Sequence, residues 1–318
     1  MGPTSNPGRK ESLPYENARS RTMKIFFGAV SLALAGTALG ATPTTTIAPG
    51  VEMPQVNLGT CCGSTTVGLG PWLDAGGSGI DSAYDYGKLV PGGKQSDIAA
   101  AFKARGTPRA SVFLTTKIPA GLGLEPSDCL TATPASALKQ VQENLKELAV
   151  GYVDLVLLHA PCKIGGDKAN AKLWEGLQMA LAQNLTRAIG ISNYKQKDIE
   201  ALLAAPSTTV TPAVNQCKMS AKTHDDSDIA FTQSKGITYE AYEAIDGCPF
   251  TDPKAQAIAA AHGVGVAQVC LRYIIQRGCV MAVGTGTDAT QAVAYAKSDL
   301  DIFGFNMTEA EMATIGSL

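Results

Sequence analysis

Four side chains capable of acid–base chemistry stand at the ends of apolar runs in this 318-residue sequence. Asp81 and Tyr86 follow one run, Lys117 ends the next, and His159 ends the one after that. A tyrosine titrates near pH 10, and a neighbouring ammonium group lowers that pKa towards the working range. An aspartate keeps such a lysine protonated, and a histidine can hydrogen-bond a polarised oxygen. Brought together, these residues predict proton transfer to an oxygen atom.

Amide, hydroxyl and aromatic side chains occupy the equivalent positions further along the chain, where they could hold a ligand. They are Ser192, Asn193, Gln216, Tyr242 and Thr285. Some of the candidate residues can also be explained by structure alone. Ser192 and Asn193 could cap a helix, and Lys117 could be a solvated residue at the rim. His159 could equally be a hydrogen-bonded core histidine. Convergence of all these residues on one rim would favour the functional reading.

The elements that position these residues are short apolar runs alternating with helical stretches, a pattern that indicates βα units and a parallel sheet. Eight strands over roughly 270 residues fit a closed (β/α)8 barrel, in which the βα loops carry the chemistry. The rival is an open doubly wound sheet, which needs a Gly-x-Gly-x-x-Gly turn after its first strand, and none is present there. We therefore predict a single-domain α/β (β/α)8 TIM barrel over residues 51–318. The expected strands are 56–60, 79–84, 111–118, 152–160, 186–192, 212–219, 237–245 and 279–287.

Helical periodicity is clearest at 134–149, where Thr133 can cap the helix and Pro134 suits its first position. Similar spacing predicts further helices at 169–183, 195–205, 253–262, 266–277 and, at the C-terminus, 308–318.

The N-terminal part of the chain divides into three segments ahead of the barrel. Residues 1–22 form an extension that could reflect a mis-called start, because Met23 directly precedes an apolar run. Residues 23–41 combine a basic flank, a short apolar core and small residues, as in a signal peptide or signal anchor. Residues 42–50 are a Thr/Pro linker. We expect a secretory route: secretion, an endomembrane lumen, or an organelle reached through it.

Composition limits the partners that can be expected. A net charge of −2 gives no electrostatic reason to expect nucleic acid. The three histidines are not at metal-ligand spacing and no Cys-x-x-Cys occurs, so no metal is expected. Secretory entry would permit disulfides among the eight cysteines, but a domain of this size does not need them, and Cys217 and Cys279 fall in expected strands, so buried thiols are the favoured interpretation. The expected partner is a small molecule, bound by a monomer.

Six motifs in order resemble the aldo-keto reductase superfamily, from about residue 52 to the C-terminus. They are the segments Asp81-Ser-Ala-Tyr-Asp-Tyr86-Gly, Leu114-Thr-Thr-Lys117, Tyr152-Val-Asp-Leu-Val-Leu-Leu-His159, Arg187-Ala-Ile-Gly-Ile-Ser192-Asn193, Pro212-Ala-Val-Asn-Gln216 and Gly236-Ile-Thr-Tyr-Glu-Ala-Tyr242. The resemblance implies reduction of an aldehyde or ketone, with hydride from nicotinamide C4 and a proton from Tyr86. Lys117, Asp81 and His159 would complete the catalytic set. Ser192, Asn193 and Gln216 would hold the carboxamide, and Tyr242 would stack on the ring.

The sequence departs from the family at the adenosine-phosphate end of the cofactor. The family's Pro-Lys-Ser segment and later arginine are replaced by Val283-Gly-Thr285-Gly-Thr-Asp288-Ala-Thr. Asp288 would repel a 2′-phosphate, whereas Thr285 could still contribute a hydroxyl. The resemblance implies NADP(H), and the local residues leave NAD(H) open. A barrel that serves as a non-catalytic binding or regulatory subunit is the alternative function.

Overall fold

The computed structural model describes residues 42–61, 65–88, 92–120 and 129–318. All of them belong to one compact unit, Thr37–Leu318. The predicted signal segment 23–41 and the extension 1–22 lie outside the described residues. Eight parallel strands form a closed barrel in the order β10-β3-β4-β5-β6-β7-β8-β9, which confirms the predicted fold.

All eight predicted strands are present, several of them shorter than expected because their outer residues belong to the loops. They are β3 (Val56–Gly59), β4 (Gly79–Asp81), β5 (Phe113–Ile118), β6 (Val153–Leu158), β7 (Thr186–Ser192), β8 (Val214–Lys218), β9 (Thr238–Tyr242) and β10 (Val280–Val283). Parallel pairing of β10 with β3, through Met281 and Val56, closes the ring.

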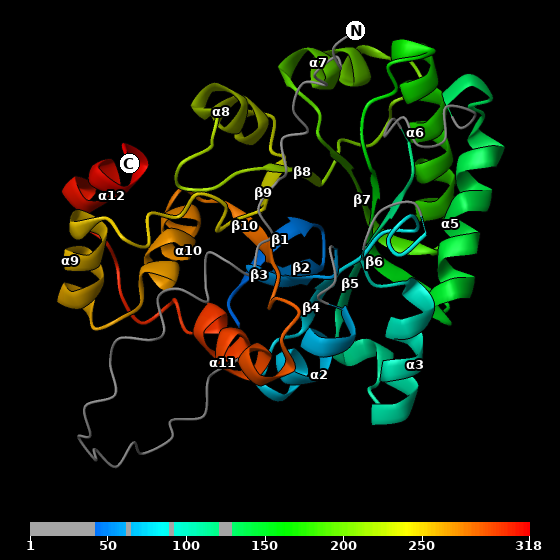
Figure 1. Cartoon of the computed structure of the whole chain (residues 1–318). Helices are drawn as coiled ribbons and strands as arrows, with labels where there is room; N and C mark the ends of the chain where they lie inside the picture. Colours follow the sequence, from blue (N-terminus) through cyan, green and yellow to red (C-terminus); the bar gives the residue numbers. More distant parts are fainter. Residues whose placement is uncertain (1–41, 62–64, 89–91, 121–128) are drawn as a thin grey trace, which may run out of the picture. The chain divides into compact units, whose positions relative to one another are not determined.

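Helices surround the strands (Figure 1). The predicted ones appear as α5 (Pro134–Leu148), α6 (Gly166–Ala182), α7 (Gln196–Ala204), α9 (Pro253–His262), α10 (Val266–Gln276) and α12 (Glu309–Gly316). Helices α2 (Thr65–Asp74), α3 (Gln95–Arg105), α8 (Asp226–Ser234) and α11 (Ala289–Leu300) complete the ring, with the 3-10 turn η1 (Arg109–Ser111) before β5. Thr133 caps α5 as predicted: its hydroxyl accepts from the Ser136 amide at 3.0 Å, and Pro134 is the first helical residue.

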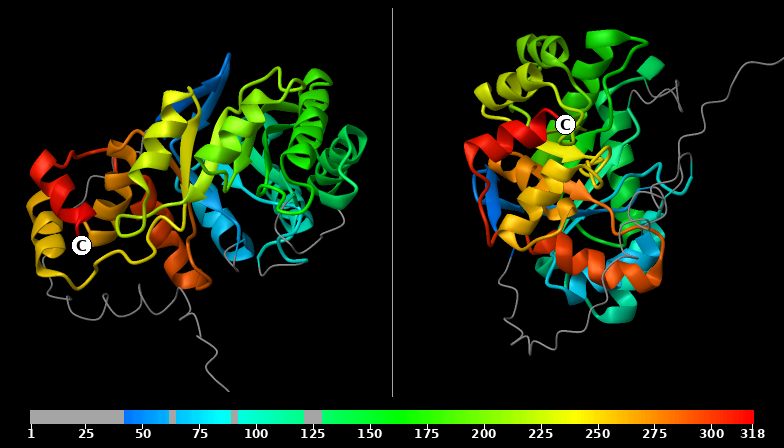
Figure 2. Two further views of the ribbon diagram at one scale, coloured as in Figure 1. Left: turned by 90° about the horizontal axis from the view of Figure 1, so that it is seen from above. Right: turned by 60° about the vertical axis from the view of Figure 1, so that its left-hand side comes forward.

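A β-hairpin precedes the barrel and was not expected. Strand β1 (Thr44–Ala48) lies within the segment predicted as a linker, and it pairs antiparallel with β2 (Val51–Pro54). The hairpin stands at one end of the barrel, in dark blue (Figure 2). Its residues Ile47, Val51 and Met53 pack in one buried cluster with Phe113 and Val214, the first residues of β5 and β8. The hairpin therefore closes the N-terminal end of the barrel.

Disulfides among the described residues correct the expectation of buried thiols. Cys129 pairs with Cys162, and Cys248 pairs with Cys270. All four lie outside the described strands, where side chains of different segments can meet, and Cys270 belongs to α10. Cys217 in β8 and Cys279 beside β10 are buried free thiols, as their strand positions suggested.

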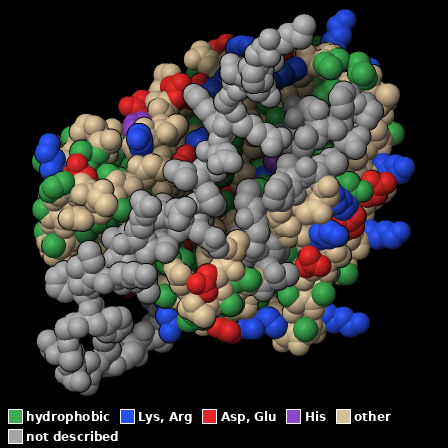
Figure 3. Space-filling model, in the orientation of Figure 1, with side chains coloured by type: hydrophobic (Ala, Val, Ile, Leu, Met, Phe, Trp, Pro, Cys, Tyr) green, Lys and Arg blue, Asp and Glu red, His purple; other side chains and the backbone are tan. Residues whose placement is uncertain are grey.

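The surface and the helices show two further features. On the face drawn in Figure 3, Lys and Arg side chains lie mixed with Asp and Glu side chains. Among the described helices, no single one combines the length and hydropathy of a membrane span. Helices α9 and α10, bent by 82° at their junction, pass that criterion only as a pair.

Candidate active site

The Lys117 ammonium group is the centre of the site. It lies at the C-terminal end of β5, is fully buried, and donates to both carboxylate oxygens of Asp81 at 2.6 and 2.9 Å. It also contacts the Ser82 carbonyl at 3.1 Å and the Tyr86 hydroxyl at 3.3 Å. Burial without a partner would be costly for this charge, and the ion pair with Asp81 offsets that cost. The predicted Asp81–Lys117–Tyr86 set is therefore brought together.

Tyr86 lies in an environment that keeps it protonated. Burial raises the pKa of Tyr86 to about 12, and the nearby Lys117 charge opposes that rise without cancelling it. The pKa of Lys117 is also raised, because the attraction of Asp81 and Tyr86 exceeds the effect of burial. Lys117 thus limits the rise in the pKa of Tyr86 but does not bring that pKa below 10. The expectation from the sequence that Lys117 lowers this pKa is therefore wrong for the structure as it stands.

His159 lies beside Tyr86 at the end of β6. The two rings meet edge to face, with centroids 5.8 Å apart. The Nδ1 atom of His159 is 3.1 Å from Oδ1 of Asp85, a fully buried residue. The predicted position of His159 near Tyr86 is thus observed, and Asp85 is an additional partner that the sequence analysis left without a role.

Asn193 connects three of the predicted ligand-holding residues. It follows β7 in the left-handed backbone region, with φ of 62°, which asparagine tolerates better than most residues. Its Nδ2 donates to the His159 carbonyl at 3.0 Å and to Ser192 Oγ at 3.1 Å, and its Oδ1 accepts from the Tyr242 hydroxyl at 2.8 Å. Ser192, Asn193 and Tyr242 therefore form one hydrogen-bonded group beside His159.

Gln216 points into a buried polar network below the site. Its Nε2 donates to Asp81 Oδ2 at 2.9 Å and to Glu240 Oε2 at 2.8 Å. Glu240 is fully buried inside the barrel and also accepts from Asn57. Burial and the nearby Asp81 charge raise the pKa of Glu240 to about 8. No described residue donates to Oε1 of Gln216.

Thr285 does not join these residues. It is fully buried, and its Oγ1 lies where a side chain on Gly68 of α2 would have to be. Asp288 caps α11 by accepting from the Thr290 amide at 2.8 Å, and hydrogen bonds from the Thr290 hydroxyl and amide lower the pKa of Asp288. The N-terminus of α11 therefore carries a negative charge, as the sequence suggested.

A family model described as the aldo/keto reductase family matches residues 69–318. The chain belongs to the aldo/keto reductase family. An aldo-keto reductase of Mycolicibacterium smegmatis is 33% identical over 248 residues, which cover 77% of this chain and 79% of that protein. An aldehyde reductase of Saccharomyces cerevisiae is 31% identical over 263 residues, 71% and 80% of the two chains.

Solved aldo/keto reductases share the fold. The crystal structure of one from Brucella melitensis matches with a TM-score of 0.74 and 27% identity, covering 87% of this chain and 99% of that one. A Bombyx mori aldo-keto reductase crystallised with NADP has a TM-score of 0.73 and 25% identity, covering 87% and 93%. This protein is accordingly an oxidoreductase of the aldo/keto reductase type.

Two acidic residues of the site were missed by sequence reasoning. Asp85 stands at a position that the motif leaves unspecified, and Glu240 stands inside an expected strand, so neither residue type pointed to a role in the site. Among the described residues, no group of three His, Cys, Asp or Glu side chains could hold a metal ion.

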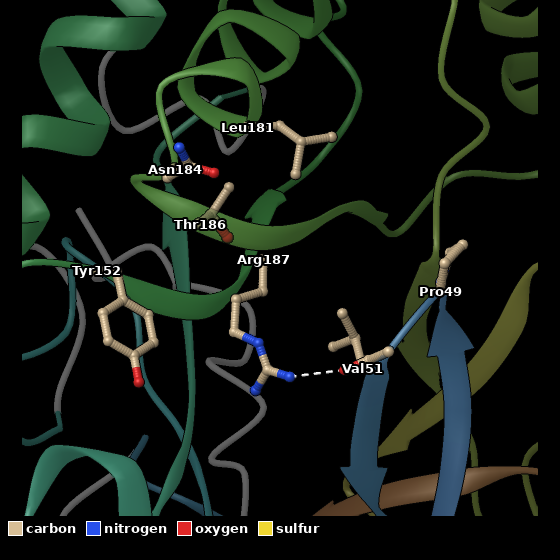
Figure 4. A pocket seen from close by; sticks show the side chains of 8 residues that line it. Pro49, Val51, Tyr152, Leu181, Asn184, Thr186 and Arg187 are labelled. Atoms are coloured by element: carbon tan, nitrogen blue, oxygen red, sulfur yellow. Dashed lines mark hydrogen bonds between the residues drawn. The ribbon is translucent and has the colours of Figure 1, made fainter.

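A cavity of about 440 Å³ lies away from these residues, at the other end of the barrel (Figure 4). Tyr152, Leu181 and Asn184 line it together with the hairpin turn. Arg187 spans it and donates to the Gly50 carbonyl at 2.7 Å. None of the predicted site residues contributes to this cavity.

Proposed function

We propose that the protein reduces an aldehyde or ketone to an alcohol with a nicotinamide cofactor, and that Tyr86 donates the proton to the carbonyl oxygen. The observation that carries the proposal is the buried contact of Tyr86 with the Lys117 ammonium at 3.3 Å. A phenol that gives up its proton here leaves a phenolate beside a fixed positive charge. His159, in edge contact with Tyr86, is suited to orient the same oxygen.

The cofactor pocket we propose is formed by Ser192, Asn193, Gln216 and Tyr242. The unpaired Oε1 of Gln216 suits a carboxamide N–H, and the half-buried Tyr242 ring is held by Asn193, as a stacking surface would require. When bound, the cofactor would supply a hydride to the carbonyl carbon. Lys117, Asp81 and His159 would hold the proton donor and the oxygen in place.

For the identity of the cofactor we propose NADP(H) with a weakened preference over NAD(H). The relative from Bombyx mori crystallised with NADP supports a phosphorylated cofactor. Asp288 at the start of α11 argues for tolerance of NAD(H), because its charge opposes a 2′-phosphate there. Thr285 is buried and would need to move before it could contact the cofactor.

The test is Tyr86→Phe, assayed for carbonyl reduction and titrated with NADPH and NADH by fluorescence. We expect turnover to fall by about 10²–10⁴-fold, the usual contribution of a general acid, with cofactor affinity nearly unchanged. Near-normal turnover would refute the role of Tyr86. If the folded wild-type protein binds neither cofactor, the non-catalytic barrel becomes the better assignment.

We also propose that the chain enters a secretory route, beginning from its apolar N-terminal segment. The Cys129–Cys162 and Cys248–Cys270 disulfides support an oxidising compartment. Expression of the full chain beside a variant starting at Thr42 tests this: only the full chain should reach the medium or an endomembrane lumen.

A further inference from the structure

Asp85 has no task in the reaction as proposed above, although it touches a residue that does. Its side chain is fully buried in the loop after β4, and Oδ1 lies 3.1 Å from Nδ1 of His159. Oδ2 is also buried and has no hydrogen-bond partner among the described residues. A buried carboxylate with a single partner depends strongly on that partner.

The ionisation of Asp85 decides which atom carries the proton in this contact. Burial raises the pKa of Asp85, but the hydrogen bond and charge of His159 outweigh burial, so the pKa lies below its usual value. An ionised carboxylate can only accept, so Nδ1 of His159 must be the donor. A neutral imidazole has one N–H, and its other nitrogen, Nε2, is then an acceptor.

The charged and titratable groups around His159 come from three elements. Asp81 ends β4, Asp85 and Tyr86 lie in the loop that follows it, and Lys117 is the last residue but one of β5. Burial lowers the pKa of His159, Lys117 lowers it further, and the bond to Asp85 works in the opposite direction. Asp85 is the aspartate in direct contact with the ring.

We propose that Asp85 is a positioning residue, which fixes the proton of neutral His159 on Nδ1 and leaves Nε2 facing the reacting oxygen. Nε2 then accepts a hydrogen bond from an alcohol when His159 is neutral and donates one to a carbonyl when His159 is protonated. This inference rests on the proposed function, because that function places the reacting oxygen beside His159.

The arrangement predicts a pH dependence for each direction of the reaction. Carbonyl reduction uses the donor form of His159, so its rate should fall as pH rises through the pKa of His159. Alcohol oxidation uses the acceptor form and should show the opposite trend. Titration of Tyr86 does not cause this change of rate with pH, since the pKa of Tyr86 is about 12.

The experiment is a long-range ¹H–¹⁵N spectrum of the full-length cofactor-free protein labelled at histidine. The chain has only three histidines, so His224→Gln and His262→Gln assign every signal. His159 should show the Nδ1–H tautomer. His262, whose Nε2 lies 3.1 Å from Glu311, should show Nε2–H. In Asp85→Asn the amide can either accept or donate, so His159 should lose its preference for the Nδ1–H form, and the pKa of His159 should fall by about one unit or more.

Glu311→Gln is the matched control, because it makes the same carboxylate-to-amide change beside His262. It should alter the His262 signal, leave that of His159 unchanged, and leave turnover unchanged. In Asp85→Asn the pH at which the rate of carbonyl reduction falls should decrease by the same amount as the pKa of His159.

An Nε2–H tautomer for His159 in the wild-type protein would overturn the inference. An unchanged pH–rate profile of carbonyl reduction in Asp85→Asn would also overturn it. The wild-type spectrum decides the tautomer even if the variant does not fold. Absence of turnover in the wild type would refute the proposed function without changing that spectrum, so the two failures are distinguishable.

Discussion

At the scale of single residues, the site combines charges that the sequence could place and contacts that it could not. Lys117, Asp81, Tyr86 and His159 stand at strand ends, and the eight-strand pattern fixes those ends on one rim. The partner of His159 could not be predicted, because the loop after β4 determines where Asp85 points. The sign of the Tyr86 pKa shift was also missed, since burial depends on side chains from several elements.

Glu240 leads to a prediction about pH and stability. Its pKa is about 8 in the folded barrel and about 4.5 in an unfolded chain, so folding retains a proton that the unfolded carboxylate releases between these values. The contribution of Glu240 to stability is therefore fully present below about pH 4.5 and is lost as pH rises towards 8. Glu240→Gln cannot ionise and should remove this loss, on the order of a few kcal/mol at pH 8.

Urea unfolding at pH 5, 6.5 and 8 measures this effect. The variant should gain stability relative to wild type as pH increases. Glu175→Gln, a change at an exposed carboxylate, should run parallel to wild type. Parallel curves for Glu240→Gln as well would show that Glu240 is already ionised in the folded state.

At the scale of elements, a disulfide joins the segments that follow β5 and β6, and the spacing of apolar residues in the sequence does not reveal it. Strand and helix positions followed from apolar spacing, and Thr133 and Pro134 marked the start of α5 correctly. The disulfides were missed because Cys129 and Cys162 are 33 residues apart and meet only when β5 and β6 are neighbours. Local sequence signals say little about contacts at such separation.

Loss of the Cys129–Cys162 disulfide should destabilise the protein. A cross-link over 33 residues restricts the unfolded chain by about 3–4 kcal/mol in the loop-entropy model. We expect Cys129→Ala to lower the free energy of unfolding by about that amount in denaturant titrations. Cys279→Ala, which removes a buried free thiol, controls for the loss of a sulfur atom. Equal losses in the two variants would show that the cross-link itself contributes little.

The start of α11 leads to a prediction about cofactor preference. Asp288→Asn keeps a side chain that caps helices well and removes the negative charge. The ratio of NADPH to NADH affinity should rise by about two- to fivefold, measured by fluorescence titration. Asp301→Asn makes the same charge change at the other end of the helix and should leave the ratio unaltered. A ratio insensitive to Asp288→Asn would place the 2′-phosphate elsewhere.

At the scale of the whole molecule, the barrel needs a cover at its N-terminal end, and the hairpin supplies it. The segment 42–50 suggested a linker because Thr and Pro are common in linkers. Threonine is equally a strand former, and only packing against the barrel distinguishes the two. Ile47 and Met53 are buried there, on a face that the composition of the segment did not reveal.

Met53→Ala tests whether the hairpin is part of the folding unit. Met53 is fully buried, and truncation of such a side chain costs about 2–5 kcal/mol. Glu52→Ala, at the exposed neighbouring position of the same strand, should cost much less in the same chemical denaturation experiment. A negligible effect of Met53→Ala would mean that the hairpin is dispensable for stability.

The amide of Gln216 joins the site to the interior of the barrel, because one nitrogen serves both Asp81 and Glu240. Two carboxylates that share a donor cannot be optimised independently: a change that draws the amide towards one weakens its bond to the other. The energetic effects of substitutions at Asp81 and Glu240 should therefore not add. Any change in this interior would have to proceed through paired substitutions, because Lys117, through Asp81 and Gln216, constrains Glu240 inside the barrel.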